Sequence, residues 1–185
     1  MYLPQPFQKR YIGPMKELIP VDLNKIIEDV KAEGKGRRVV WQDSESIAFL
    51  SSGRRERRDF HIDPADEVTL QLSGVQNLVY RTPEGGERTA VIEAGQMLLC
   101  PGGVPHSPRV EENSWFIVFE RKRRPGEIDL FLWFCDACGE KIYEATAEVG
   151  DYRRDPVARV HEKFYGDESL RTCRNCGWVV PVPPA

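Results

Sequence analysis

HIDPADEVTLQLSG (61–74) and GQMLLCPGGVPHSP (95–108) are the two stretches of the sequence that decide the fold. In the first stretch, His61 precedes Glu67 by six residues. In the second, His106 follows a glycine, a proline and another glycine at the spacing G-x5-P-x-G-x2-H. Two imidazoles and one carboxylate are the ligand set of a facial triad on non-haem Fe(II), which leaves adjacent positions open for substrate and dioxygen. The two stretches therefore predict a metal site in a β-rich chain.

Short β-like runs separated by turns surround these two stretches. They are VVW (39–41), IAFL (47–50), VTLQL (68–72), NLVY (77–80), TAVI (89–92), MLLC (97–100) and WFIVF (115–119). Their near-regular spacing, without a strand–helix–strand rhythm, predicts a sandwich or barrel. Before them, apolar residues at helical spacing predict a helix that Asp22 caps and Gly34 ends. A second helix is expected around 157–164.

Composition excludes several classes of protein. The chain has 185 residues, with 26 Lys plus Arg against 29 Asp plus Glu, for a net charge of −3. This balance argues against a dedicated nucleic-acid-binding protein, which usually has a basic domain. No apolar run approaches the roughly 18 residues of a membrane span. The start, MYLPQPFQKR, lacks the apolar core of a signal peptide, so we expect a cytoplasmic protein without membrane contact.

Four of the five cysteines form two Cys-x-x-Cys pairs, which are separated by 34 residues. In a cytosolic chain, paired motifs of this kind predict a metal site and not disulfides. Four thiolates suit zinc or a rubredoxin-like iron, and the spacing leaves the metal's identity open. The predicted ligands are Cys135, Cys138, Cys173 and Cys176. Cys100 is interpreted as a core residue or a pocket-lining thiol, and His161 as a structural residue.

The two opening stretches resemble the paired motifs of the cupin superfamily, although Asp63 stands where the first motif often has a second histidine. VVWQDSESIAF, RRERRDFHIDPADE, PHSP, WFIVFERKRRPG and the twin Cys-x-x-Cys tail further resemble the bacterial 3-hydroxyanthranilate 3,4-dioxygenases. The likeness runs from about Arg38 to Cys176. It implies an all-β fold: a cupin (double-stranded β-helix, or jelly-roll) barrel with its N-terminal helix over residues 1–125, and a small rubredoxin-like metal-binding segment over 126–185.

The resemblance also implies roles for particular residues. His61, Glu67 and His106 would ligate the catalytic Fe(II). Glu120 would be the catalytic glutamate and would contact the amino and hydroxyl edge of the substrate. Glu67 would also bind the substrate. Two arginines would bind the substrate carboxylate, and the remaining predicted substrate-binding residues are therefore Arg57 and Arg109. The second arginine carries over only if one residue is deleted after His106, since Val110 stands at the ungapped position.

The implied reaction is extradiol-type cleavage of 3-hydroxyanthranilate by O2. Its product, 2-amino-3-carboxymuconate semialdehyde, closes to quinolinate, a precursor of NAD in tryptophan catabolism. The family likeness further implies a homodimer and iron, or else zinc, at the four cysteines. We expect that second site to be structural or iron-supplying, because the reaction needs no external electrons.

Two departures from the family pattern keep other functions open. Arg37 and Arg38 stand where the family usually has an asparagine, and the loop at Gly102-Gly103 is expected to be more flexible than the proline-rich family form. These differences allow a paralogous dioxygenase for a substituted hydroxyanthranilate or another aminophenol. A non-catalytic metal-binding cupin that senses a metabolite is a further alternative.

Overall fold

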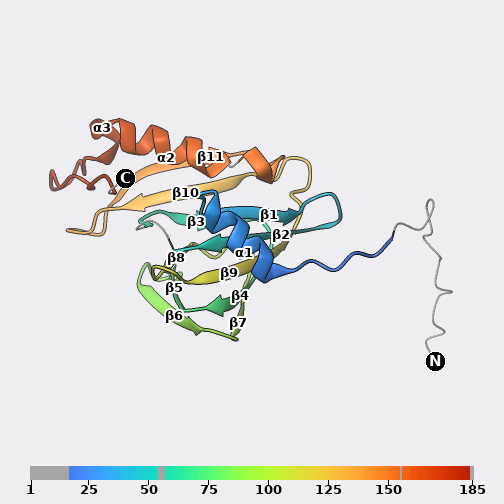
Figure 1. Ribbon diagram of the computed structural model, residues 1–185. Coiled ribbons are helices and arrows are strands. Elements are labelled where there is room, and N and C mark those ends of the chain that lie inside the picture. The colour runs from blue at the N-terminus through green and yellow to red at the C-terminus, as the bar shows by residue number, and fades with distance from the viewer. Residues whose placement is uncertain (1–16, 54–56, 155, 184–185) are drawn as a thin grey trace, which may run out of the picture.

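The computed structural model describes residues 17–53, 57–154 and 156–183 (Figure 1). Within them, strands dominate, and short helices lie at the two ends of the chain. In order, the elements are α1 (Leu23–Ala32), β1 (Arg37–Trp41), β2 (Ser46–Ser52), β3 (Phe60–Ile62), β4 (Glu67–Ser73), β5 (Val75–Arg81), β6 (Glu87–Glu93), β7 (Met97–Cys100), β8 (His106–Val110), β9 (Trp115–Arg121), β10 (Asp129–Phe134), β11 (Lys141–Ala147), a 3-10 helix (Tyr152–Arg154), α2 (Pro156–Gly166) and α3 (Glu168–Arg171).

The strands form two antiparallel sheets. One has the order β1-β2-β9-β4-β7 and the other the order β11-β10-β3-β8-β5-β6. From β7 to β10 the chain alternates between the sheets, so that strands close together in sequence line opposite walls. This jelly-roll arrangement confirms the predicted all-β cupin barrel. Figure 1 shows α1 lying across the strands of one sheet and α2 beside β11.

The predicted N-terminal helix is confirmed as α1. The side chain of Asp22 accepts a hydrogen bond from the Lys25 backbone N–H at 3.1 Å, which caps the helix. Gly34 follows the helix with a φ of 66°, in the left-handed region that ends many helices. Val30 is fully buried against Leu50 and its neighbours, so α1 covers the outer face of the five-stranded sheet.

All seven predicted runs lie within strands, but four strands were not predicted. β3 has three residues and follows a run of charges, and β8 contains Pro108, which cannot donate a hydrogen bond to a neighbouring strand. Both carry a histidine of the predicted metal site. β10 and β11 are the other two. The helix expected around 157–164 is confirmed as α2.

The segment after residue 125 shares a sheet with the barrel. In β10, Phe131 pairs with His61 of β3, so β10 and β11 extend the six-stranded sheet. α2 packs on this extension, where Phe131, Trp133 and Phe164 are fully buried. The division into 1–125 and 126–185 therefore stays a prediction about the sequence, because the structure joins the two segments through β10.

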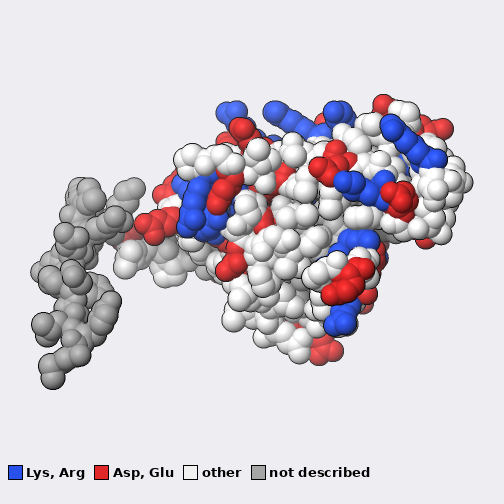
Figure 2. Space-filling model, turned by 180° about the vertical axis from the view of Figure 1, so that it is seen from behind, with Lys and Arg blue, Asp and Glu red and all other residues white. Residues whose placement is uncertain are grey.

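The described surface carries mixed charge. Figure 2 shows Lys and Arg side chains interspersed with Asp and Glu over the visible face, instead of gathered into one basic area. In the same described residues, none of the helices combines the length and the apolar character needed to span a membrane.

Gly74 lies at the tight connection between β4 and β5, and its lack of a side chain is required there. Its φ is 68°, and an added Cβ would lie 1.9 Å from Ser114 Oγ, which accepts a hydrogen bond from Val75. Gly85 has a similar φ of 85°, but an added Cβ there would meet nothing within 4 Å.

We expect Gly74→Ala to lower the free energy of unfolding by about 1–3 kcal/mol more than Gly85→Ala does. Urea unfolding of the two variants measures this, and equal losses would contradict it.

Candidate functional site

His61, Glu67 and His106 come together inside the barrel. β3 supplies His61, the first residue of β4 is Glu67, and the first residue of β8 is His106. One ligand atom from each lies within 4.8 Å of the others, and the two histidines face each other in register across β3 and β8. His106 Nε2 lies 3.8 Å from Glu67 Oε2. Two imidazoles and one carboxylate at this spacing fit a divalent metal with open coordination positions.

Hydrogen bonds fix the orientation of both imidazoles. His106 Nδ1 donates to the carbonyl oxygen of Val104 at 2.9 Å, so Nε2 is the nitrogen that faces Glu67 and would bind a metal. His61 stacks on Phe131, with ring centroids 4.8 Å apart, and its Nε2 lies 2.8 Å from Asp129 Oδ2. Burial lowers the pKa of His61, so the neutral ring donates from Nε2 and holds its lone pair on Nδ1.

A buried arginine offsets part of the negative charge of the carboxylates around the triad. The Arg123 side chain is 5% exposed, and it donates to Asp63 at 2.6 Å, to Glu120 at 2.7 Å and to Asp129 at 2.5 and 2.7 Å. One guanidinium does not balance three carboxylates. Burial and the contact with Asp63 raise the pKa of Glu120 to about 9, so Glu120 holds a proton at neutral pH. The group thus approaches neutrality.

Sequence reasoning missed three members of this group. Asp63 was noted only as a departure from the cupin motif, and Asp129 and Arg123 lie in a charged, turn-rich segment that reads as solvated. The sequence gives little indication of their role, because a buried charged residue cannot be told from its exposed charged neighbours by sequence alone. The Lys122 side chain beside Arg123 is exposed.

The structure places Arg57 and Glu120 near the triad. Glu120 pairs with Glu67 across β9 and β4, and the carboxylates of Asp63, Glu67 and Glu120 lie within 4.8 Å of one another. Arg57 precedes β3, and its positive charge contributes to lowering the pKa of both Glu67 and His61, after the larger effects of burial and of hydrogen bonding. Glu120 therefore adjoins the triad, and the charge of Arg57 acts on two of its members.

Arg109 is not brought to the triad. Side chains alternate between the two faces of a strand, so His106, Pro108 and Val110 share one face of β8. His106 is buried in the barrel, and Arg109 is exposed on the other face. When the family pattern is aligned without a gap, the second arginine falls at Val110, which lies on the same face of β8 as His106. We therefore leave Arg109 out of the proposed site.

The loop before His106 is closely packed. An added Cβ at Gly102 would lie 3.1 Å from the carbonyl oxygen of Pro64, and Gly102 N–H donates to Asp66 Oδ1 at 2.9 Å. Gly103 N–H donates to the carbonyl oxygen of Asp63 at 2.7 Å. These contacts tie the loop to the segment that joins β3 to β4, so the absence of a side chain at Gly102 permits close approach of two backbones. Arg38 pairs with Glu33, and Arg37 donates to the carbonyl oxygen of Tyr152.

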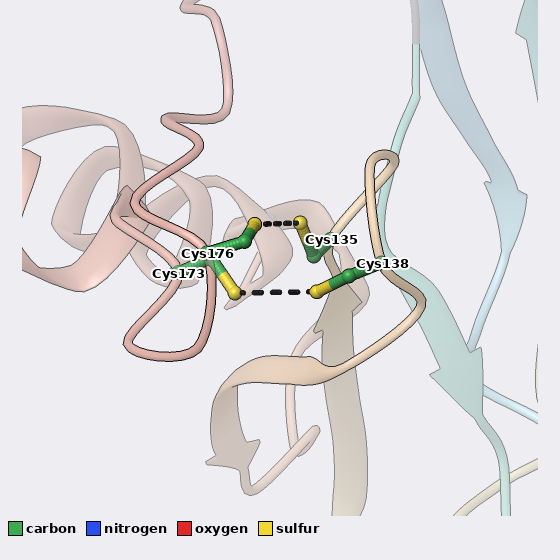
Figure 3. Close-up of side chains that lie close together, drawn as sticks. All are labelled: Cys135, Cys138, Cys173 and Cys176. Carbon is green, nitrogen blue, oxygen red and sulfur yellow. Dashed lines mark hydrogen bonds between the residues drawn. The ribbon is translucent and has the colours of Figure 1, made fainter.

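The four paired cysteines converge in a second group (Figure 3). Sγ of Cys135 lies 3.5 Å from that of Cys176, and Sγ of Cys138 lies 3.6 Å from that of Cys173. A disulfide is about 2.05 Å long, whereas sulfurs around a tetrahedral metal at about 2.3 Å are roughly 3.8 Å apart. The distances therefore fit a tetrathiolate metal site. β11, α2 and α3 occupy the long interval between the two pairs.

The fold and these two groups define a metal-site cupin, and comparison with known proteins gives the family. A model described as 3-hydroxyanthranilic acid dioxygenase matches residues 15–165. Relatives named 3-hydroxyanthranilate 3,4-dioxygenase include one from Bacillus cereus, 37% identical over 93% of this chain and 89% of its own, and one from Ruegeria pomeroyi, 38% identical over 79% and 81%. A cupin-2 domain containing protein from Shewanella frigidimarina aligns with 52% of this chain and 92% of its own, at 20% identity and a TM-score of 0.43.

The chain belongs to the 3-hydroxyanthranilic acid dioxygenase family. This confirms the family that the motifs and the flanking segments predicted.

Replacing Arg123 tests the buried charge group. Arg123→Met leaves buried carboxylates without their counter-charge, so we expect the free energy of unfolding to fall by about 3–5 kcal/mol. Lys122→Met, which changes the neighbouring exposed charge, should stay within about 0.5 kcal/mol of the parent. Urea unfolding followed by tryptophan fluorescence compares them. Similar stability of the two variants would show that the Arg123 contacts contribute little.

Proposed function

We propose that the chain is an Fe(II)-dependent dioxygenase that opens the ring of 3-hydroxyanthranilate with O2. The observation that carries this proposal is the inward-facing group of His61, Glu67 and His106 in a chain of this family. These three residues would hold the iron, and bound Fe(II) supplies the redox chemistry that lets O2 react with an aromatic ring. The protein's own part is to bind and orient the substrate and to manage its protons.

Two further residues would orient the substrate. The planar guanidinium of Arg57 matches a planar carboxylate, so Arg57 would bind that group. Glu120 and Glu67 would face the amino and hydroxyl edge. Because Glu120 holds a proton at neutral pH, it can donate a hydrogen bond to that edge.

The proposed reaction balances without another reactant. The bond between C3, which carries the hydroxyl, and C4 breaks, and both atoms of O2 enter the product. The product, 2-amino-3-carboxymuconate semialdehyde, therefore equals the substrate plus O2. No external electron donor is required, which agrees with a structural role for the tetrathiolate site.

Replacing a ligand and an off-site arginine tests the reaction. Glu67→Gln removes the carboxylate charge from the triad, so we expect it to lose catalytic-site iron and at least about 100-fold of kcat/KM. Arg109→Gln is the matched control and should retain activity within about twofold, because its side chain lies outside the barrel. Oxygen uptake and the near-ultraviolet absorbance of the semialdehyde measure both. An iron-loaded parent protein without either signal would refute the proposed function.

A substituted hydroxyanthranilate or another aminophenol is a second candidate substrate. One observation favours it: Val110, at the ungapped position of the family's second arginine, lies on the same face of β8 as His106. In addition, the buried side-chain oxygens of Thr69, Gln71 and Gln76 have no hydrogen-bond partner among the described residues. A polar ring substituent would satisfy such oxygens. Competition between two substrates for one enzyme decides between them, and O2 uptake with any aminophenol would dismiss the non-catalytic sensor.

We propose iron, with zinc as the alternative, at Cys135, Cys138, Cys173 and Cys176, in a structural role. Cys173 is buried, and its replacement removes one of four thiolates. We expect Cys173→Ser to lose this metal and several degrees of thermal stability, while kcat per catalytic iron stays within about threefold. Metal analysis, thermal unfolding and activity normalised to iron measure these effects. Unchanged stability and metal content would contradict this role.

We also propose a homodimer, as the family likeness implies. Exposed apolar side chains support an interface: Met97 and Leu99, on the edge strand β7, are 69% and 59% exposed.

A further inference from the structure

Asp59 is a buried carboxylate that joins the predicted substrate arginine to the C-terminal helix α2. It is 0% exposed and lies just before β3. Arg57 Nε donates to both Asp59 oxygens at 3.1 Å, and Arg57 Nη2 donates to Oδ2 at 2.9 Å. On the other side, His161 Nε2 lies 3.1 Å from Asp59 Oδ1, at ion-pair distance although outside hydrogen-bond geometry.

His161 has a fixed position because α2 is packed on the barrel sheet. Its ring meets the ring of Trp133 edge-on, with centroids 5.7 Å apart, and that of Tyr165 at 6.1 Å. Trp133 belongs to β10, is fully buried and stacks on Phe164 at 4.3 Å. His161, which the sequence analysis interpreted as a structural residue, therefore faces the buried carboxylate of Asp59.

We propose that Asp59 and His161 are positioning residues that hold the Arg57 guanidinium in the orientation that binds the substrate carboxylate. The inference rests on the proposed function. A guanidinium binds a carboxylate well only when its N–H groups lie in the carboxylate plane, so its orientation sets the affinity. Of the two predicted arginines, Arg57 is the one whose charge acts on Glu67 and His61, so its orientation bears on binding of the carboxylate. α2 thus takes part in substrate binding through His161.

The mechanism predicts an effect confined to ligands that carry a carboxylate. 3-Hydroxyanthranilate and 2-aminophenol share the adjacent amino and hydroxyl groups, but 2-aminophenol has no carboxylate. Loss of Arg57 positioning should weaken binding of the first and leave binding of the second unchanged. A role of Asp59 or His161 in general stability would weaken both.

The test uses iron-loaded, full-length protein under anaerobic conditions, with the dissociation constant of each ligand measured by titration. Asp59→Asn keeps the shape of the side chain but removes its charge, and we expect 3-hydroxyanthranilate to bind about tenfold more weakly. His161→Phe keeps the ring that packs on Trp133 and should weaken binding about threefold, while His161→Gln, which keeps a polar N–H near Asp59, should restore it. Binding of 2-aminophenol should change less than about twofold in all three variants, and KM should rise with little change in kcat.

Three results separate the possible failures. Equal weakening of both ligands, or no weakening of either, in an active parent protein would overturn the inference and leave the proposed function standing. A parent protein that consumes no O2 with 3-hydroxyanthranilate would overturn the proposed function, and the inference with it. If Asp59→Asn does not fold, the comparison of His161→Phe with His161→Gln decides.

Discussion

The buried charge of Arg123 is the interaction on which the candidate active site depends. Its guanidinium contacts Asp63, Glu120 and Asp129, and Asp129 in turn holds one nitrogen of His61. Uncompensated buried charges cost several kcal/mol each, so these carboxylates are stable inside the barrel only with their counter-charge and a shared proton. The contact with Asp129 determines which nitrogen of His61 is available to a metal. Burial and Asp63 raise the pKa of Glu120 against the lowering effect of the Arg123 charge, so Glu120 keeps a proton.

The barrel brings the triad and its neighbouring carboxylates together from two parts of the sequence, β3–β4 and β8–β10. β3, β4, β8 and β9 contribute the triad and Glu120, and β10 contributes Asp129. Because β10 also supports α2, the C-terminal segment adjoins the site. The contact between His161 and Asp59 is a second link of the same kind.

The spacing of the two cupin-like motifs was sufficient to predict the triad, since each motif places its ligands at strand ends that meet in one barrel. The seven predicted strands could be found because each is marked by its own run of apolar residues, which is visible without knowing the residues it packs against. Arg109 was predicted through a gapped comparison, which takes no account of the alternation of side chains along β8; the structure has Arg109 exposed, on the face of β8 opposite His106. The contacts of Arg123, Asp59 and His161 could not be predicted, because their partners come from other parts of the chain and their charges resemble those of a solvated surface.

If the triad and the charged group around it bind iron as proposed, the protein inserts one O2 into one aromatic ring. The most direct measurement is the ratio of O2 consumed to 3-hydroxyanthranilate consumed by the iron-loaded protein, with no reductant present. We expect a ratio of about one and a product heavier than the substrate by both oxygen atoms. Substrate loss without O2 uptake, or uptake that requires an added reductant, would contradict it.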